Sequence, residues 1–550
     1  MILIKKWSLF VALLTFGWVA SNGQNRPILP LTLSNAEILR MQYALQAQTI
    51  SGIKPWPTGG FDDLARLIDI TRYDTTQLTS GPGKAKASRY VHLPKVLEKI
   101  TFMNLLTDNI PFNNTNEIKY SLLYRWKKSS KINSNKKPFI FMAHQDVVPV
   151  AEADKASWTH EAFAGEIAPD ILEPDQKSFF GRGAIDNKGN MMSILEAIER
   201  LAAEGFQPDR DLFFIFEHDE EGKATGAQTI VKYLENTYGK NSNFAEMLMD
   251  EGGSIVTNLV DGLKISAVIG TAEKGFVTIG IKAAKQGGHA SMPDTSNSIM
   301  LVANALKRVY DKTPTYKFDR STELFFEKMG PYIDNADTKL WFSDPYNYTS
   351  QITTLLAKDV KTHAMIHTSM APTVFAAGDS NSTNVVPSFV TAYMNFRMVT
   401  GDSATGVLKN VRSLIPNVSP DSARENLVSV FIKDGRFTNP TGSKEPEGSG
   451  YQLVSQMVKK IFNNIPTSPF LMIGATDSRY FEGLADHFIK FSPVTDPQGF
   501  HTYNERIKVE DYRKSILFYQ QLISEGKCLS CKAVTLPSPV SVPLIKPKKK

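Results

Sequence analysis

Short apolar segments and helical segments follow one another in the first half of the chain. Strand-like apolar runs, bounded by polar residues and glycines, cover residues 138–144, 211–218, 245–250 and 264–270. Between them, apolar residues recur at the spacing of an amphipathic helix, as in residues 187–205. Strands that alternate with helices predict an α/β fold with a mostly parallel sheet and helices on both faces. In such sheets, functional sites form where strands end and loops begin.

The pattern changes after residue 270 and returns to its first form near residue 436. Between these points, residues 274–283 and 389–397 alternate between apolar and polar positions, and an aromatic-rich helical stretch separates them. We therefore predict an inserted α+β domain that interrupts the main domain. The predicted boundaries are 24–270 and 436–530 for the two parts of the main domain and 271–435 for the inserted domain.

The two ends of the chain differ in composition from the rest. Residues 1–23 contain two lysines, then an apolar run, then small residues. This order is typical of a secretory signal peptide, and the apolar run is short for a membrane span. We expect cleavage near Gly23 and an exported protein, periplasmic or secreted; an uncleaved membrane anchor is the alternative. Residues 531–550 are rich in proline and lysine, which predicts a disordered tail.

The formal net charge of +6 comes from the two ends of the chain. Six lysines lie there: Lys5, Lys6, Lys546, Lys548, Lys549 and Lys550. The rest of the chain is therefore neutral overall, so we expect no nucleic-acid partner and no stable membrane insertion. Cys528 and Cys531 are too few for a structural zinc site, and export favours a disulfide between them over a redox role.

Three adjacent carboxylates, Asp219, Glu220 and Glu221, closely follow the apolar run at residues 212–216. Clustered negative charge at the edge of a core is unfavourable unless a cation or a shared proton relieves it. A solvated acidic turn is the plain alternative, because charged residues usually lie outside the core. Partners elsewhere in the chain decide between the two. Further polar residues stand at predicted strand ends or in loops: His144 with Asp146, Asp186, Asp250 and His501.

Together these residues form a set of metal ligands. The set consists of His144, Asp186, Glu221, Asp250 and His501. Five nitrogen and oxygen donors suit two zinc ions that share one carboxylate, an arrangement that activates water near neutral pH and polarises a scissile carbonyl. Glu220 would then be the general base, and Asp146 would fix the orientation of the His144 imidazole. Asp219 would support the turn.

In their order along the chain, these motifs resemble the dinuclear zinc metallopeptidases that include aminoacylase, carnosinase, succinyl-diaminopimelate desuccinylase and carboxypeptidase S. The matching motifs, from about residue 90 to 526, are HQDVVPV, GRGAIDNKG, DEEGKATGA, MDEGG, GGHASMP, NVVP, GATDSRYF and the terminal histidine. HQDVVP, GRGAIDNKGN and the long inserted segment are most similar to the carboxypeptidase S branch. One departure is that KAT replaces a second glycine common after the glutamate pair, which changes the loop and leaves the ligands in place.

The resemblance implies a catalytic main domain and an inserted domain that serves as lid and dimerisation domain. One zinc ion would be held by His144 and Asp250, the other by Glu221 and His501, with Asp186 bridging them. We therefore expect two Zn²⁺ per chain, with Co²⁺ as a substitute in vitro. A homodimer through the lid domain is a further hypothesis.

The resemblance also assigns substrate contacts. His289 in GGHASMP would stabilise the oxyanion of the tetrahedral intermediate, and Asn384 in NVVP would help to hold the substrate. Arg397 in NFR would grip a substrate carboxylate, which a guanidinium suits through two parallel hydrogen bonds. The alternative for Arg397 is an exposed strand arginine paired with an acid. Ser449 in EGSG is a weaker candidate.

These features predict an exported zinc metallohydrolase that cleaves an amide bond next to a free carboxylate, in a small peptide or an N-acyl amino acid. Within the enzyme class, a carboxypeptidase of broad specificity, a narrow dipeptidase and an N-acyl-amino-acid hydrolase remain open. A catalytically inactive binding protein on the same fold is the alternative from another class. The complete ligand set together with Glu220 favours the enzyme, because loss of function usually removes a ligand or the base.

Overall fold

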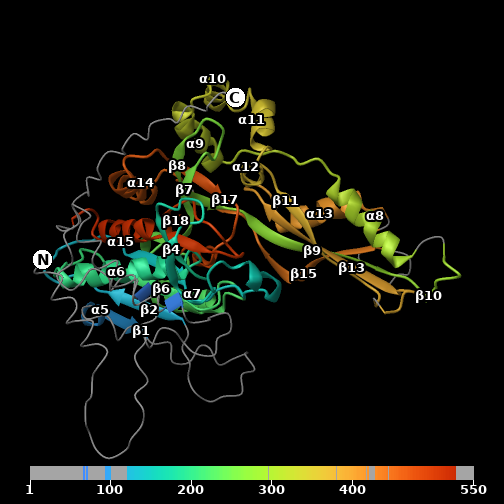
Figure 1. Cartoon of the computed structure of the whole chain (residues 1–550), viewed down its shortest axis with the longest axis horizontal. Coiled ribbons are helices and arrows are strands. Elements are labelled where there is room, and N and C mark those ends of the chain that lie inside the picture. The colour runs from blue at the N-terminus through green and yellow to red at the C-terminus, as the bar shows by residue number, and fades with distance from the viewer. Residues whose placement is uncertain are drawn as a thin grey trace, which may run out of the picture. The chain divides into compact units, whose positions relative to one another are not determined.

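The computed structural model describes the chain in several segments (Figure 1). They are residues 66–67, 70–71, 93–100 and 121–527, with gaps at 295–296, 380, 417, 420–427 and 444. The predicted signal peptide at residues 1–23, both cysteines and the predicted tail at 531–550 lie outside the described residues. Within the described segments, no helix is long and apolar enough to cross a membrane.

The main domain is built on a mixed sheet whose central strands are parallel (Figure 1). In spatial order its strands are β1 (Leu97–Ile100), β2 (Leu122–Trp126), β6 (Leu212–Glu217), β3 (Phe139–His144), β7 (Ala245–Thr257), β18 (Ala485–Thr495), β8 (Ile265–Glu273) and β16 (Thr441–Gly442), and β17 (Thr467–Met472) also pairs with β8. The parallel pairs are β3 with β6, β3 with β7, β18 with β7 and β17 with β8. This confirms the predicted α/β class and the strands expected from the apolar runs.

Helices cover both faces of this sheet, since side chains of β3 alternate between the faces and all of them are buried. Ile140 and Met142 join a buried apolar cluster with residues of α7 (Thr225–Tyr238). On the opposite face, the ring of Phe141 lies 6.3 Å from that of Tyr519 in α15 (Val509–Ile523), which packs beside α6 (Lys188–Ala203). A further helix, α14 (Ser449–Ile461), packs against α15 and β18.

A second sheet, called the lid after the role predicted for this segment, lies within residues 275–438. Its strands, in spatial order, are β11 (Ser369–Ala377), β13 (Phe389–Met398), β9 (Gly275–Ala284), β15 (Val428–Thr438) and β14 (Val418–Ser419). Helices α8 (Ser298–Tyr310) and α13 (Ala404–Leu414) lie along one face (Figure 1). The inward side chains of β13 and β9 form one apolar cluster with these two helices, which explains the predicted alternation. A short ladder joins β10 (Gly288–His289) to β12 (Val385–Val386).

The aromatic-rich stretch inside the predicted lid packs with residues of the main sheet. It forms four helices: α9 (Arg320–Met329), α10 (Ala336–Ser343), α11 (Thr349–Leu356) and α12 (Val360–Met365). Phe325, Phe326 and Phe342 share an apolar cluster with Val268 of β8 and Phe470 of β17. The boundaries predicted at 271 and 435 therefore enclose four helices that pack on the main sheet, in addition to the lid sheet with its own apolar cluster.

Lys274 lies where the chain passes from β8 into β9, and its side chain is buried. Its Nζ atom donates hydrogen bonds to the carbonyl oxygens of Ala364 and His367, each at 2.8 Å, and to Oγ of Ser369 at 3.3 Å. The first two acceptors lie at the end of α12 and just beyond it, where exposed carbonyls attract a cation. Lys274 therefore joins the two stretches of chain that lead into the lid sheet.

Candidate metal centre

Four of the five ligands predicted from the sequence lie together. His144 ends β3, and its Nε2 atom lies 2.9 Å from Oδ1 of Asp186. The other carboxylate oxygen of Asp186, Oδ2, lies 3.0 Å from Nε2 of His501. His501 Nε2 is also 3.1 Å from Oε1 of Glu221. Asp186 therefore lies between the two histidines, as the predicted bridging carboxylate would.

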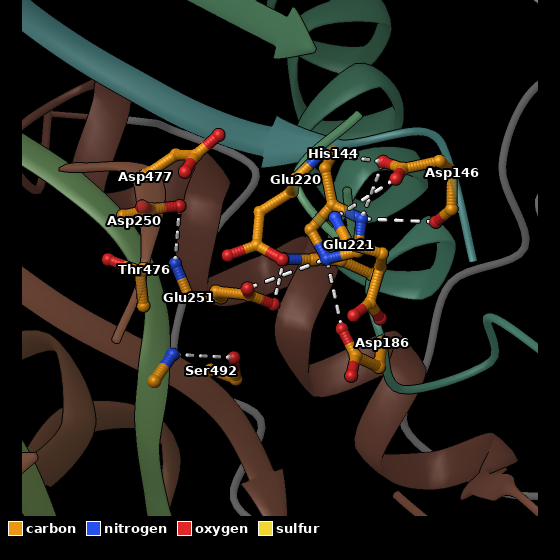
Figure 2. Close-up of polar contacts among 12 residues, drawn as sticks. His144, Asp146, Asp186, Glu220, Glu221, Asp250, Glu251, Thr476, Asp477 and Ser492 are labelled. Carbon is orange, nitrogen blue, oxygen red and sulfur yellow. Dashed lines mark hydrogen bonds and ion pairs between the residues drawn. The ribbon is translucent and has the colours of Figure 1, made fainter. Parts of the chain in front are cut away.

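The structure brings Glu251 into this group and leaves Asp250 outside it. Glu251 Oε1 lies 3.4 Å from Nε2 of His144, and its other oxygen accepts a hydrogen bond from the side chain of Asn187. Asp250 turns instead towards Thr476 and Asp477 in the segment after β17 (Figure 2), and its Oδ2 atom accepts the N–H of Ser478 at 3.1 Å. Successive side chains of a strand point to opposite faces, so only one of these neighbours can face His144. Among the described residues, it is thus Glu251, and not Asp250, whose carboxylate lies beside His144.

Asp146 contacts both halves of the site, as its predicted role requires (Figure 2). Its carboxylate lies 3.3 Å from Nδ1 of His144, and its backbone oxygen is 3.0 Å from the same atom. The two carboxylate oxygens also accept the backbone N–H groups of Glu220 and Glu221, at 3.2 and 3.0 Å. Asp146 therefore orients the imidazole and holds the acidic turn against it.

Asp219 supports the turn from the other side. Its Oδ2 atom accepts hydrogen bonds from the backbone N–H and the hydroxyl of Thr225, and Oδ1 accepts the N–H of Gly226 at 2.9 Å. These N–H groups belong to the first turn of α7, so Asp219 caps that helix. The three adjacent carboxylates of the sequence thus separate into one that caps a helix and two that face the ligand cluster.

Glu220 is a buried carboxyl group in a crowded acidic environment. Burial, together with the carboxylates of Glu251, Asp477 and Glu221, raises its pKa to about 10, although His144 opposes this shift. Burial also raises the pKa of Glu251 to about 8. Both carboxyl groups are thus forced towards their neutral form by desolvation and by like charge.

The histidines respond in the opposite direction. Hydrogen bonds that His501 donates to the carboxylates of Asp186 and Glu221 raise the pKa of His501 to about 10. At His144, burial opposes the charged form, but the carboxylates of Glu251, Asp146 and Asp186 hold its pKa well above the usual value. Although burial acts against it, contact with the two histidines keeps the pKa of Asp186 below the ordinary range.

This donor set fits metal cations. Three overlapping groups have donor atoms that all lie within 4.8 Å of one another: His144 with Asp186 and Glu251, His144 with Glu220 and Glu221, and Asp186 with Glu221 and His501. Four carboxylates face two imidazoles, so cations between them would relieve the like charge that raises the carboxyl pKa values. Nitrogen and carboxylate oxygen donors are typical of zinc sites.

His289 and Asn384 lie next to each other in the lid. The ladder between β10 and β12 sets His289 opposite Val385, and the N–H of Ala290 donates to the carbonyl oxygen of Asn384 at 2.8 Å. His289 is exposed, and its Nδ1 atom lies 2.8 Å from Oγ of Ser291. Among the described residues, no hydrogen bond or ion pair joins His289 to the ligand cluster. The two predicted lid residues therefore lie together where β10 pairs with β12.

The pKa of Arg397 responds to charges at the ligand cluster. Burial and the nearby guanidinium of Arg479 lower the pKa of Arg397, while the carboxylates of Glu273 and Glu220 act in the opposite sense. Its Nε atom donates to the side chain of Asn395 at 3.1 Å, and its guanidinium lies 5.7 Å from the centre of the Phe276 ring. Arg479 belongs to the motif GATDSRYF, but that motif alone did not indicate a role for its arginine.

Ser449 is not brought to this site. It begins α14, is exposed, and its hydroxyl donates to Oε1 of Glu246 at 3.1 Å. Glu246 stands at the start of β7, whereas Asp250 and Glu251 lie further along the same strand. The glycines that flank Ser449 mark the beginning of a helix, so they gave no information about substrate.

Residues 140–525 match the family model of peptidase family M20/M25/M40. The chain belongs to this family. Like its relatives, it is a hydrolytic enzyme of the metallopeptidase and amidohydrolase type, as its similarity to carboxypeptidase-like and N-acyl-amino-acid hydrolase proteins shows.

Two relatives illustrate the range of this family. The chain is 32% identical over 412 residues to the probable carboxypeptidase S-like 2 of Dictyostelium discoideum, covering 74% of each chain. It is 30% identical over 395 residues to the human N-fatty-acyl-amino acid synthase/hydrolase PM20D1, covering 71% of this chain and 74% of that protein.

Solved M20 structures share the fold. The yeast dipeptidase Dug1p matches with a TM-score of 0.58 at 14% identity, over 89% of this chain and 98% of that chain. Human carnosine dipeptidase 1 matches with a TM-score of 0.57 at 13% identity, over 89% and 99%. At this level of identity the likeness concerns the fold alone.

Proposed function

We propose that this enzyme is an exported, zinc-dependent hydrolase that cleaves an amide bond next to a free carboxylate, in a small peptide or an N-acyl amino acid. One observation carries the proposal: donor atoms of Glu220, Glu221 and His144 lie within 4.8 Å of one another. The charge of Glu220 also acts on the pKa of Arg397 in the lid sheet. An acid/base group and a carboxylate-binding group would thus flank the same scissile bond.

His144, Glu251, Glu221 and His501 would hold two zinc ions, with Asp186 between them. When bound, the ions supply positive charge that polarises the substrate carbonyl and makes a water molecule more acidic. The same charge favours the ionised form of Glu220, because opposite charges lower the pKa of a carboxyl group. Glu220 can then take a proton from the attacking water and deliver it to the leaving nitrogen.

Arg397 supplies the substrate preference in this proposal. A guanidinium binds a carboxylate through two parallel N–H···O bonds and keeps its charge when partly buried. Arg479 lies near it, and its guanidinium pairs with Asp477 at 3.1 Å. Two like charges side by side are unfavourable, so an incoming carboxylate would relieve their repulsion.

The names of the relatives agree with two substrate classes: peptides that are cleaved at their carboxyl end, and N-fatty-acyl amino acids. Both classes place the scissile amide next to a free carboxylate. The proposal of export rests on the three-part sequence pattern of residues 1–23. A homodimer formed through the lid would allow the exposed His289 to reach the site of the neighbouring subunit.

The test is hydrolysis of a panel of dipeptides and N-acyl amino acids by the mature protein loaded with zinc. Each compound is offered with a free and with an amidated carboxylate. We expect cleavage of the free forms and loss of most activity on the amidated forms. Arg397→Ala and Arg397→Lys should both lose this discrimination, because an ammonium group cannot make the paired contact.

Arg412→Ala is the matched control. Arg412 also belongs to the lid, but its guanidinium donates to the backbone oxygen of Val430. This variant should keep the preference for the free carboxylate. Equal cleavage of free and amidated substrates by the wild type would refute the carboxylate preference, and no hydrolysis of any compound would refute the proposed reaction.

A further inference from the structure

The loop that carries His501 is an excursion closed at its base. An isolated bridge pairs Gln498 with Arg506, and the N–H of Arg506 donates to the oxygen of Gln498 at 3.3 Å. Within the loop, Gly499 has φ 86° and His501 has φ 55°, both in the left-handed region. A Cβ at Gly499 would lie only 2.5 Å from Cα of Glu505, so the turn requires glycine there.

Glu505 stands at the base of this excursion and is fully buried. Its Oε1 atom accepts the backbone N–H of Ile185 at 2.9 Å and that of Asp186 at 3.1 Å. Its Oε2 atom accepts a hydrogen bond of 2.6 Å from Nη1 of Arg182. The backbone oxygen of Glu505 accepts the N–H of Gly181 at 2.9 Å. One residue thus binds the glycine-rich loop of residues 181–186 at four points.

Arg182 completes the connection in the other direction. Its Nη2 atom donates to the carbonyl oxygen of Thr502, next to His501, at 3.0 Å. Arg182 is also buried, and its guanidinium lies 5.4 Å from the centre of the Trp158 ring. The loop of Asp186 and the loop of His501 therefore hold each other through one buried ion pair.

Asp186 and His501 both lie on loops, outside any helix or strand. A loop residue keeps a fixed position only when contacts from elsewhere hold it. A buried ion pair is rarely a net source of stability, but it does fix the geometry of the groups that it joins. Glu505 accepts the backbone N–H of Asp186, and the carboxylate of Asp186 lies 3.0 Å from His501.

We propose that Glu505 is a positioning residue, paired with Arg182, that sets the separation of Asp186 and His501 and thereby the affinity of the metal position formed by His501, Glu221 and Asp186. Glu505 touches neither substrate nor metal in this assignment. The other proposed metal position, at His144, should depend less on Glu505, because His144 lies on a strand and is oriented by Asp146. The inference rests on the proposed two-metal site.

The experiment measures metal binding separately from activity. Apo-protein of the full mature chain is titrated with Co²⁺, and the visible absorption and the heat of binding report the first and second equivalents. Glu505→Gln is the main variant, because the amide can still accept the two N–H groups but loses the charge that pairs with Arg182. We expect it to weaken one of the two equivalents by about 10–100-fold, the usual effect of losing a partner behind a metal ligand.

Asp170→Asn is the matched control. Asp170 forms an equally buried pair with Arg506, the residue next to Glu505, with 2.8 Å between Nε and Oδ2. It also accepts the hydroxyl of Ser178 and the N–H of Leu172. It contacts no predicted ligand, so its loss should reduce stability while both equivalents of Co²⁺ bind as in the wild type.

Arg182→Lys is a second, milder variant that is used if Glu505→Gln does not fold. A lysine can reach either Glu505 or Thr502 but cannot hold both, so we expect a smaller weakening of the same equivalent. Wild-type affinity for both equivalents in a folded Glu505 or Arg182 variant would overturn the inference. The inference would also be overturned if the folded Glu505 or Arg182 variant bound both equivalents more weakly and Asp170→Asn showed the same weakening. Failure of the wild type itself to bind two metals would instead refute the proposed two-metal site.

Discussion

The Nε2 atom of His501 lies 3.0 Å from Oδ2 of Asp186, which places the last predicted ligand of the chain against the predicted bridging carboxylate. The other oxygen of Asp186 faces His144 at the end of β3. Asp186 thus contacts two histidines that lie near the two ends of residues 140–525, the segment that matches the family model. In the proposed site, this relation would set two metal positions side by side.

Glu220→Gln should abolish turnover and leave both metals bound, because Glu220 is assigned to proton transfer and the metal positions have other donors. Loss of a general base typically lowers the rate by about 10²–10⁴-fold. Steady-state kinetics and elemental analysis of the same preparation test this. Glu161→Gln, at an exposed position, is the control and should behave as the wild type. Near-normal turnover by fully metal-loaded Glu220→Gln protein would contradict the assignment.

Glu251→Gln and Asp250→Asn should differ in metal content. Glu251 points at His144, so its loss should reduce bound metal from about two ions per chain towards one. Asp250 accepts backbone N–H groups of Glu251 and Ser478, and an asparagine oxygen can still accept a hydrogen bond. Elemental analysis after dialysis against low zinc distinguishes the two. The opposite outcome, metal loss only in Asp250→Asn, would return the ligand role to Asp250.

Chelation should remove activity, and added zinc or cobalt should restore it. The proposed chemistry needs a metal cation to polarise the carbonyl and to make the attacking water more acidic. Activity is measured after treatment with a chelator, after its removal, and after addition of each metal. Full activity in protein shown by elemental analysis to contain no metal would disprove a metal-dependent mechanism.

His289→Ala should lower kcat more than it raises KM, by about the 10²–10³-fold of a lost oxyanion donor. The side chain is exposed in the lid, so the free energy of unfolding should hardly change. Kinetics on the best substrate of the panel, with a thermal unfolding curve, test both statements. Ser291→Ala, which removes the 2.8 Å contact to Nδ1, should have a smaller effect. An unchanged kcat with a raised KM would assign His289 to substrate binding alone.

Lys274→Met should alter how stability depends on pH. Burial, aided by the charge of Arg397, lowers the pKa of Lys274 to about 7, and Asp402 opposes this shift; the ordinary value is 10.5. Between these values the folded protein has lost a proton that the unfolded chain keeps. The contribution of Lys274 to the free energy of unfolding therefore rises with pH over that range and is constant below about pH 7.

The histidines that face Lys274, His363 and His367, both have lowered pKa values, so they titrate below this window. Denaturant unfolding of the wild type and the variant at several pH values between 7 and 10 tests the prediction. The variant should lose this rise, whereas Lys264→Met, at an exposed position, should keep it. Parallel pH curves for wild type and Lys274→Met would show that Lys274 stays charged in the fold.

Much of the main domain follows from local sequence patterns. The apolar runs became β3, β6, β7 and β8 because short runs with polar boundaries favour buried strands irrespective of distant contacts. His144 stands at the end of β3, and Glu220 and Glu221 follow β6, its parallel neighbour. Since parallel strands end at the same edge, their meeting could be predicted from the sequence.

The choice between Asp250 and Glu251, the packing of the aromatic helices on the main sheet, and the pairing of Glu505 with Arg182 depended on tertiary structure. In each case the sequence offers several residues of the right chemical type. Which strand face a carboxylate occupies, which sheet a set of phenylalanines covers and which buried acid meets a buried arginine are settled by contacts between segments far apart in the chain. Such contacts leave no local periodicity, so the sequence by itself determined the strands and the ligand types, and only the fold decided which neighbour fills each place.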